Sequence, residues 1–373
     1  MKTALSSRFV RTTAALALGL SAIFSTAQAQ EELKFYNWSD YIAEDTIARF
    51  EQETGIKVTY DVYDSNETLE AKLMAGNSGY DLVVPSSNFM ELQIKAGIFQ
   101  QLDKDKLSNL KNLDPALLTF LDSKDPGNKH GVPYLWGTTG IGYNMEMVTK
   151  VLGADAPVDS WELILNPAHM EKLAECGVTF LDSPNEMYPI ALQYAGMDPD
   201  SASAKDYKSS SPAAKLLKDV RPYVRQFNSS QYINDIANGD ICVAVGWSGD
   251  VFQAQARAEE VGNGIEVSYA IPKEGTEIWF DMLMIPADAE NSENAHKFIN
   301  YLLRPDVIAE ITNYVAYANP NLAATNLVEP DIATDPGIYP PAETRKRLFV
   351  THQRPGKIAK LQNRFWSNLK TGR

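Results

Sequence analysis

The 373-residue chain has little of what catalysis usually requires, because it contains only two cysteines and four histidines. None of the histidines lies in the spacing of a catalytic triad or of a zinc site. Residues 246–249 (Gly-Trp-Ser-Gly) lack the G-x-S-x-G pattern of a hydrolase nucleophile, and neither a P-loop nor a dinucleotide-binding fingerprint is present. The sequence therefore predicts no enzymatic activity, no metal site and no cofactor.

Basic residues are outnumbered as well. The chain has 34 lysines and arginines against 48 aspartates and glutamates, which gives a formal net charge of -14. Such a protein repels nucleic acid and anionic membrane surfaces and attracts cations. Acidity also keeps many soluble proteins in solution, so the net charge alone does not identify a ligand.

Apolar runs that could span a membrane are missing too. The strongest candidate, residues 12–24, is shorter than the roughly 20 residues that a transmembrane helix needs. A basic N-terminus precedes this run, Ala27 and Ala29 follow it, and no cysteine stands there to carry a lipid. This order is that of a secretory signal, so we predict a signal peptide at residues 1–29, cleaved after Ala29, and a soluble mature protein.

The two cysteines, Cys176 and Cys242, would then lie in an oxidising compartment. An even pair in an exported protein is a candidate disulfide, and the long loop that it closes would restrict the unfolded chain. The alternative is two buried thiols too far apart to bond. We predict the disulfide.

Strand and helix patterns alternate in the first part of the mature chain. Apolar residues predict strands at 33–38, 56–62 and 80–84, and helical spacing predicts helices at 42–53 and 68–74 between them. This βαβαβ order is typical of an open α/β sheet, in which ligands bind beyond the carboxyl ends of the strands. The loops at these ends are residues 38–41, 64–67 and 85–89.

The rest of the chain continues the α/β pattern. Residues 158–175 read as mostly helical, and further strands are predicted at 178–181, 241–245 and 278–285. Residues 132–144 combine extended chain with glycines and suit a crossing between lobes. A mature chain of this length exceeds what one hydrophobic core usually organises, so we expect two lobes.

Several short segments follow one another in a specific order. Each is weak evidence alone, but the ordered set resembles the periplasmic putrescine- and spermidine-binding proteins of ABC importers over nearly the whole mature chain. The segments are residues 37–41, 84–86, 136–144, 230–235, 245–250 and 319–324.

The resemblance implies a type II periplasmic-binding-protein fold, in which two α/β lobes are joined by crossing segments and the ligand cleft lies between them. Residues 30–137 with 252–318 would form one lobe, and residues 138–251 with 319–373 the other. It also implies a periplasmic monomer without stable membrane insertion, which captures putrescine or spermidine and delivers it to a membrane permease.

Matching positions imply a set of ligand-binding residues. Ser230 adjoins one of them, Ser229, and either serine can face the cleft. The implied residues are Trp38, Ser39, Asp40, Tyr41, Ser86, Phe89, Glu186, Ser229, Trp247, Asp250, Trp279, Asp281 and Tyr317.

These residue types suit a polyamine on physical grounds. Each ammonium group donates three hydrogen bonds and accepts none, so its pocket must supply carboxylates or carbonyls. Aromatic faces suit the methylene chain and attract cations by about 0.5–2 kcal/mol each. The acids at or near strand ends, or within a strand, are Asp40, Glu186, Asp250 and Asp281.

Some of these residues also have a purely structural interpretation. Trp38 and Trp247 alone would more often be core aromatics, and Asp40 can cap the helix predicted from Ile42. Asp281 is harder to explain in this way, because an unpaired carboxylate within an apolar strand is costly.

Other ligand classes are alternatives. A sugar site also uses tryptophan and aspartate, an iron site would need paired tyrosines, and an amino acid is another small solute. Several carboxylates around aromatic walls favour a multiply charged cation. The choice among putrescine, spermidine, cadaverine and agmatine stays open, although Trp279 favours tolerance of spermidine, and Asn88 and Ser183 lie where they can tune the far end of the cleft.

Overall fold

The computed structural model describes residues 31–262, 264–352 and 354–372. The predicted signal peptide, residues 1–29, lies outside the described residues. Within the described ranges, no helix is both long and apolar enough to cross a membrane.

The first part of the described chain alternates strands and helices, as the sequence predicts. Two 3-10 helices, Lys104–Lys106 and Ser108–Asn112, follow the last of these alternations. The elements are β1 (Glu32–Trp38), α1 (Thr46–Thr54), β2 (Lys57–Tyr63), α2 (Asn66–Met74), β3 (Leu82–Val83), α3 (Ser87–Lys95) and α4 (Pro115–Leu121).

The middle of the chain supplies a second set of strands with their own helices. It contains one 3-10 helix, Arg221–Tyr223. The elements are β4 (Gly131–Asn144), α5 (Met145–Leu152), α6 (Glu162–Leu165), α7 (Pro167–Leu173), β5 (Val178–Phe180), α8 (Pro184–Tyr194), α9 (Pro212–Val220), β6 (Gln226–Phe227), α10 (Tyr232–Ala237), β7 (Val243–Trp247), α11 (Ser248–Val261) and β8 (Val267–Ala270).

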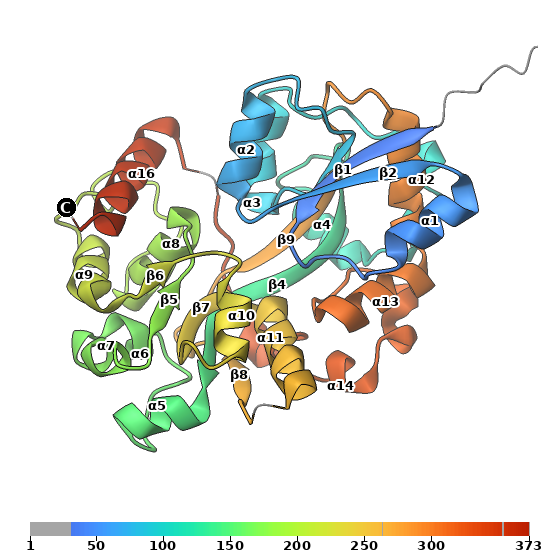
Figure 1. Ribbon diagram of the computed structural model, residues 1–373. Helices are drawn as coiled ribbons and strands as arrows, with labels where there is room; N and C mark the ends of the chain where they lie inside the picture. Colours follow the sequence, from blue (N-terminus) through green and yellow to red (C-terminus); the bar gives the residue numbers. More distant parts are fainter. Residues whose placement is uncertain (1–30, 263, 353, 373) are drawn as a thin grey trace, which may run out of the picture. The chain divides into compact units, whose positions relative to one another are not determined.

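The last part returns to the first set of strands and ends in helices. Figure 1 shows α12 beside β1 and β2, and the C-terminal α16 beside α8 and α9. The elements are β9 (Ile278–Met284), α12 (Ser292–Leu302), α13 (Pro305–Val315), a 3-10 helix (Leu322–Leu327), α14 (Pro330–Ala333), α15 (Ala342–Arg345) and α16 (Gly356–Lys370).

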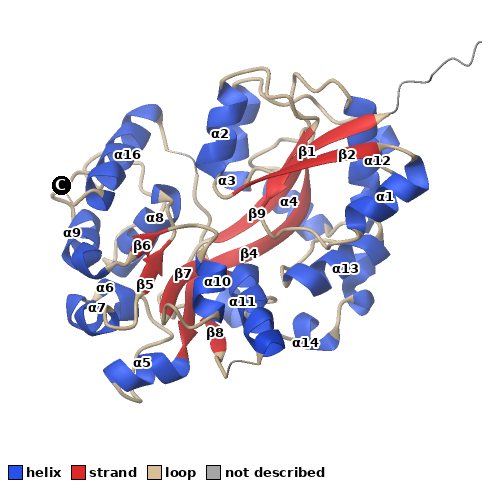
Figure 2. Ribbon diagram, viewed as in Figure 1, coloured by secondary structure: helices blue, strands red, loops and turns tan. Residues whose placement is uncertain are grey.

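The described strands join edge to edge in the order β2-β1-β3-β9-β4-β7-β5-β6, and β8 pairs with β4 (Figure 2). On one side of β4, β1 is parallel to β2 and β3. On its other side, β5 is parallel to β6 and β7. Each group is therefore a small, largely parallel α/β sheet, and β9 joins the first group to β4 in the antiparallel direction.

Strand β4 belongs to both groups. Its first part, through Thr138, pairs with β9, whereas its residues from Thr139 onward pair with β7 and, further along, with β8. The predicted crossing at residues 132–144 is thus one continuous strand. Gly140 permits the close approach of β8, because a Cβ atom there would lie 2.5 Å from the Ala270 carbonyl oxygen.

A disulfide joins Cys176 and Cys242, which confirms the prediction. Cys176 lies just before β5 and Cys242 just before β7, and these two strands are parallel neighbours. The bond therefore ties together two strands that are distant in sequence.

One local prediction is wrong. Helix α1 begins at Thr46 with Asp45 at its N-cap, so Asp40 does not cap it. Asp40 has a φ of 54°, and its carboxylate accepts a hydrogen bond from Arg257 instead. Residues 158–175 are mostly helical, as predicted, and the helix is divided in two because Pro167 begins a new helix that the Asn166 side chain caps.

The lobe boundaries stay a prediction. The change of partner along β4 falls between Thr138 and Thr139, next to the predicted boundary at residues 137 and 138. Strand β8 lies within the predicted range 252–318 of the first lobe but pairs with the part of β4 that belongs to the second group of strands.

Candidate functional site

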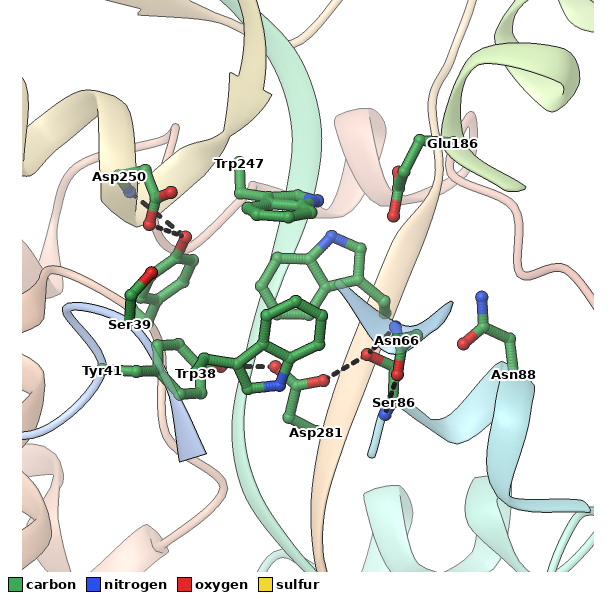
Figure 3. Close-up of a pocket in the computed structure, with 12 residues that line it drawn as sticks. Trp38, Ser39, Tyr41, Asn66, Ser86, Asn88, Glu186, Trp247, Asp250 and Asp281 are labelled. Atoms are coloured by element: carbon green, nitrogen blue, oxygen red, sulfur yellow. Dashed lines mark hydrogen bonds between the residues drawn. The ribbon is translucent and has the colours of Figure 1, made fainter. Parts of the chain in front are cut away.

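One pocket is lined by residues from both groups of strands. They come from the loops after β1 and β3, from the starts of α2, α3, α8 and α11, from the end of β7, from β9 and from the segment after α13. The lining residues are Trp38, Ser39, Tyr41, Asn66, Ser86, Asn88, Glu186, Trp247, Asp250, Trp279, Asp281 and Tyr317 (Figure 3).

Asp281 is held on both carboxylate oxygens. The Tyr41 hydroxyl donates to Oδ2 at 2.8 Å, and the Ser86 hydroxyl donates to Oδ1. Asn66 in turn fixes Ser86, since its Nδ2 donates to the Ser86 hydroxyl at 2.9 Å and its Oδ1 accepts from the Ser86 amide at 3.0 Å. The Asp281 carboxylate therefore has a defined orientation in the pocket.

Asp250 is held in the same manner by two tyrosines. The Tyr317 hydroxyl donates to Oδ1 at 2.7 Å and the Tyr232 hydroxyl donates to Oδ2 at 2.8 Å. Asp250 lies in the first turn of α11, where the helix dipole favours a negative charge. Figure 3 shows Asp250 on the opposite side of the pocket from Glu186.

Glu186 is the third acid of the pocket. It lies in the first turn of α8, and its Oε2 accepts a hydrogen bond from the Thr139 hydroxyl at 2.7 Å. Thr139 also accepts a hydrogen bond from the Trp279 indole at 3.3 Å. The crossing strand β4 thus links this acid to one of the aromatic walls.

Burial raises the pKa of all three acids, Glu186, Asp250 and Asp281, to about 7. Hydroxyl donors oppose the shift, because they stabilise the charged carboxylates. The donors are Thr139 at Glu186, the two tyrosines at Asp250, and Ser86 and Tyr41 at Asp281. Among the described residues, no Lys, Arg or His nitrogen lies within 4.0 Å of any of these carboxylates. A bound cation would therefore relieve an electrostatic cost as well as form contacts.

Aromatic rings form the walls. Trp38 and Trp247 meet edge to face with their centroids 5.4 Å apart, and Trp279 lies 5.5 Å from Tyr317. The Trp38 indole donates to the Val84 carbonyl at 2.8 Å, which fixes the ring. Rings held in this way offer flat faces to a methylene chain and an attraction for cations.

Strand ends explain how the site forms. Trp38 ends β1, and Ser86 follows β3 and bridges to Asp281 on β9. Because β1 and β3 are parallel neighbours, their carboxyl ends meet at one edge, as predicted from the βαβαβ pattern. Alternation along β9 points Trp279 and Asp281 to the same side.

The structure brings together all the predicted ligand-binding residues except Asp40, Phe89 and Ser229. Asp40 is exposed and pairs with Arg257, and Phe89 is buried within α3. Ser229 is buried, and its hydroxyl accepts a hydrogen bond from the Asp182 amide, whereas Ser230 is partly buried. As ligand contacts, all thirteen residues stay predictions.

Two residues of the site were not predicted. Asn66 lies in the loop 64–67 that topology had nominated, but a polar loop residue gives no sign that it holds Ser86. Tyr232 is fully buried behind the pocket and orients Asp250 from α10. No local pattern marks this tyrosine, since its contact depends on the packing of α10 against α11. Within the described residues, no group of three or more His, Cys, Asp or Glu could hold a metal ion.

Comparisons with known proteins find similar chains over the whole length. The putrescine-binding periplasmic protein PotF of Escherichia coli (strain K12) is 55% identical over 371 residues, which is 100% of both chains. The putrescine-binding periplasmic protein SpuD of Pseudomonas aeruginosa (strain UCBPP-PA14) is 52% identical over 368 residues, 98% of this chain and 99% of the relative.

A solved structure has the same fold. The putative spermidine/putrescine ABC transporter from Listeria monocytogenes superposes with a TM-score of 0.81 at 32% identity, covering 92% of this chain and 100% of that chain. The predicted two-lobed α/β fold of periplasmic binding proteins is thereby confirmed. The family described as bacterial extracellular solute-binding protein matches residues 45–340, so the chain belongs to the bacterial extracellular solute-binding proteins.

Proposed function

We propose that the protein captures a polyamine, putrescine or spermidine, in this pocket. The observation that carries the proposal is the set of three buried carboxylates that have no cationic partner among the described residues and stand between aromatic walls. A ligand with two or more ammonium groups joined by methylenes matches both features. The names of the relatives support the same ligand class, since PotF and SpuD are putrescine-binding proteins.

We assign a part of the ligand to each group of residues. One ammonium would donate to Asp281, which Tyr41 and Ser86 hold, and another to Asp250, which two tyrosines hold. The methylene chain would lie against Trp38 and Trp247. A neutral sugar would leave these carboxylates without a counter-charge, which disfavours it.

Ligand binding would also hold the two lobes together. Asp281 and Ser86 belong to the first group of strands, whereas Glu186 and Trp247 belong to the second. A ligand that contacts both groups stabilises the closed arrangement by its higher affinity for that arrangement. The proposed lobes are those predicted from the sequence, with β4 as one crossing.

A cellular role follows from this function. We infer that residues 1–29 direct export and are removed, and that the mature protein works in the periplasm as a monomer. It would deliver the polyamine to the membrane permease of an ABC importer. The relatives are binding proteins, so the acids of the pocket bind cations and catalyse no reaction.

Calorimetric titration tests the proposal. The mature protein, unfolded and refolded to remove any bound ligand, is titrated with putrescine, spermidine, cadaverine and agmatine, and with a neutral sugar and an amino acid as controls. We expect at least one of putrescine and spermidine to bind saturably. We expect neither the sugar nor the amino acid to bind. Binding of the sugar or the amino acid but of no polyamine would overturn the proposal.

A further inference from the structure

A fourth acid lies behind the pocket and was not predicted as a ligand residue. Glu277 immediately precedes β9, and side-chain alternation places it on the same side as Trp279 and Asp281. It is only 1% exposed. A buried carboxylate on the pocket side of this strand requires an explanation.

The contacts of Glu277 are incomplete. Its Oε1 accepts hydrogen bonds from the Thr351 hydroxyl and, at 3.4 Å, from Asn88 Nδ2. Its Oε2 is buried and has no hydrogen-bond partner among residues 31–262, 264–352 and 354–372. The Asn88 Oδ1 is likewise buried without a partner, and Asn88 lines the pocket. These two residues, which are hydrogen-bonded to each other, thus each have one acceptor that no donor among the described residues satisfies.

These acceptors lie at one end of the pocket. Figure 3 shows Asn88 on the same side as Glu186 and across from Asp250. Burial and then the negative charge of Glu186 raise the pKa of Glu277. The two acids are thus close enough to repel each other, and a cation near Asn88 would be attracted by both.

Nearby cations do not neutralise Glu277 directly. The buried Lys124 donates to the Thr351 carbonyl at 3.2 Å, and Arg354 pairs with Asp200. Among the described residues, no basic nitrogen lies within 4.0 Å of the Glu277 carboxylate. A structural ion pair therefore does not account for this acid.

We propose that Glu277 and Asn88 form a cation subsite beyond Glu186, which makes the pocket select a triamine such as spermidine over a diamine such as putrescine. The Asn88 carbonyl oxygen accepts a hydrogen bond from a further ammonium group, and Glu277, which ionises when the cation binds, supplies the negative charge behind it. This inference rests on the proposed capture of polyamines and adds a residue that determines which one is preferred.

The structural alternative is a protonated Glu277 that only ties Thr351 to Asn88. A glutamine has the same shape and retains both of these hydrogen bonds, so Glu277→Gln removes the charge alone. The matched control is Glu290→Gln, which removes one negative charge from a side chain that is 76% exposed and pairs with Lys34 at the surface.

The experiment is calorimetric titration of the wild type and both variants with spermidine, putrescine and a terminally mono-acetylated spermidine. In Glu277→Gln we expect the spermidine Kd to rise at least tenfold, while the putrescine Kd changes less than threefold. The wild type should bind the acetylated ligand at least tenfold more weakly than spermidine, and the variant should lose this preference. Glu290→Gln should behave as the wild type.

Three outcomes would overturn the inference: unchanged spermidine affinity in Glu277→Gln, equal losses for spermidine and putrescine, or an unchanged preference over the acetylated ligand. If Glu277→Gln does not fold, Asn88→Ala gives the same test, since it removes the acceptor that faces the pocket. If the wild type binds no polyamine, the proposed function itself is overturned. If the wild type binds both polyamines and neither Glu277→Gln nor Asn88→Ala changes the affinities, only the subsite is overturned.

Discussion

The two ends of the pocket are built differently. Around Asp250 and Asp281, hydroxyl groups of the protein satisfy both oxygens of each carboxylate. Around Glu186, a threonine holds one oxygen, and the neighbouring Asn88 and Glu277 each keep an acceptor without a partner in the part of the chain that the structure describes. The first arrangement fixes the carboxylates that every polyamine would meet. The second leaves acceptors whose use depends on the length and charge of the ligand.

The largest expected effect comes from removing a charge at the fixed end. Asp281→Asn or Asp250→Asn should weaken the binding of every polyamine by about 100- to 1000-fold, because the loss of one partner from a buried charge pair costs about 2–5 kcal/mol. Calorimetry measures the loss, and circular dichroism checks that the fold is intact. Unchanged affinity in both variants would refute the assignment of the site.

Acidification from pH 8 to pH 5.5 should weaken binding by about 10- to 100-fold for each pocket acid that must be ionised, since one pH unit below a pKa corresponds to about 1.4 kcal/mol. The pocket acids have a pKa of about 7, so they are ionised at pH 8 and protonated at pH 5.5, whereas the polyamine stays charged throughout. Binding near pH 7 should therefore release protons, which calorimetry in buffers of different ionisation enthalpy detects. Affinity that does not vary with pH contradicts the raised pKa values.

The same shifts bear on stability with the opposite sign. Below about pH 4 the acids are protonated in both folded and unfolded chains, so they contribute no difference. As the pH rises to about 7, the unfolded chain ionises first, and the folded protein loses stability. Wild-type protein should thus gain thermal stability relative to Asp281→Asn when the pH falls from 8 to 5.5. A stability difference that is independent of pH would mean that Asp281 does not titrate in this range.

A smaller loss is expected from the residues that orient Asp250. Tyr232 does not line the pocket, so Tyr232→Phe removes a positioning hydrogen bond without removing a ligand contact. Because a hydrogen bond to a charged group contributes about 1.5–3 kcal/mol, we expect affinity to fall by about tenfold or more. In this variant the apparent pKa in the pH dependence of affinity should also rise, because the Tyr232 hydroxyl stabilises the ionised carboxylate of Asp250. A loss of affinity without this shift would indicate a packing defect.

The disulfide should affect stability and leave both ends of the pocket unchanged. Replacing Cys176 and Cys242 by serine should lower the free energy of unfolding by about 2–5 kcal/mol, as is usual for a native disulfide. Polyamine affinity should change less than twofold, because neither cysteine lines the pocket. Denaturant unfolding and calorimetry measure the two quantities, and a large loss of affinity would show that β5 and β7 transmit strain to the site.

Local patterns predicted much of the fold. Alternating strands and helices located β1, β2 and β3, and their carboxyl ends nominated the loops that hold Trp38 and Ser86. The start of α1 was missed, because Asp40 resembles a helix cap in sequence while its backbone adopts a positive φ. Its carboxylate instead meets Arg257, which is 217 residues away in the sequence.

Prediction of the site failed where long-range packing decides the contacts. Tyr232 reaches Asp250 from a neighbouring helix, and Glu277 meets Thr351 from a distant part of the chain. Glu277, which immediately precedes β9, was not singled out from the sequence. The sequence could not show that one of its oxygens lacks a partner, since that depends on every neighbour in the fold.

The central claim is that the pocket recognises ammonium groups through buried carboxylates. The most direct measurement is a pair of titrations at pH 8 with putrescine and with 1,4-butanediol, which has the same four methylenes but hydroxyl groups in place of the ammonium groups. We predict saturable binding of putrescine and no binding of the diol at concentrations that saturate the protein with putrescine. Equal affinity for both ligands would contradict the account.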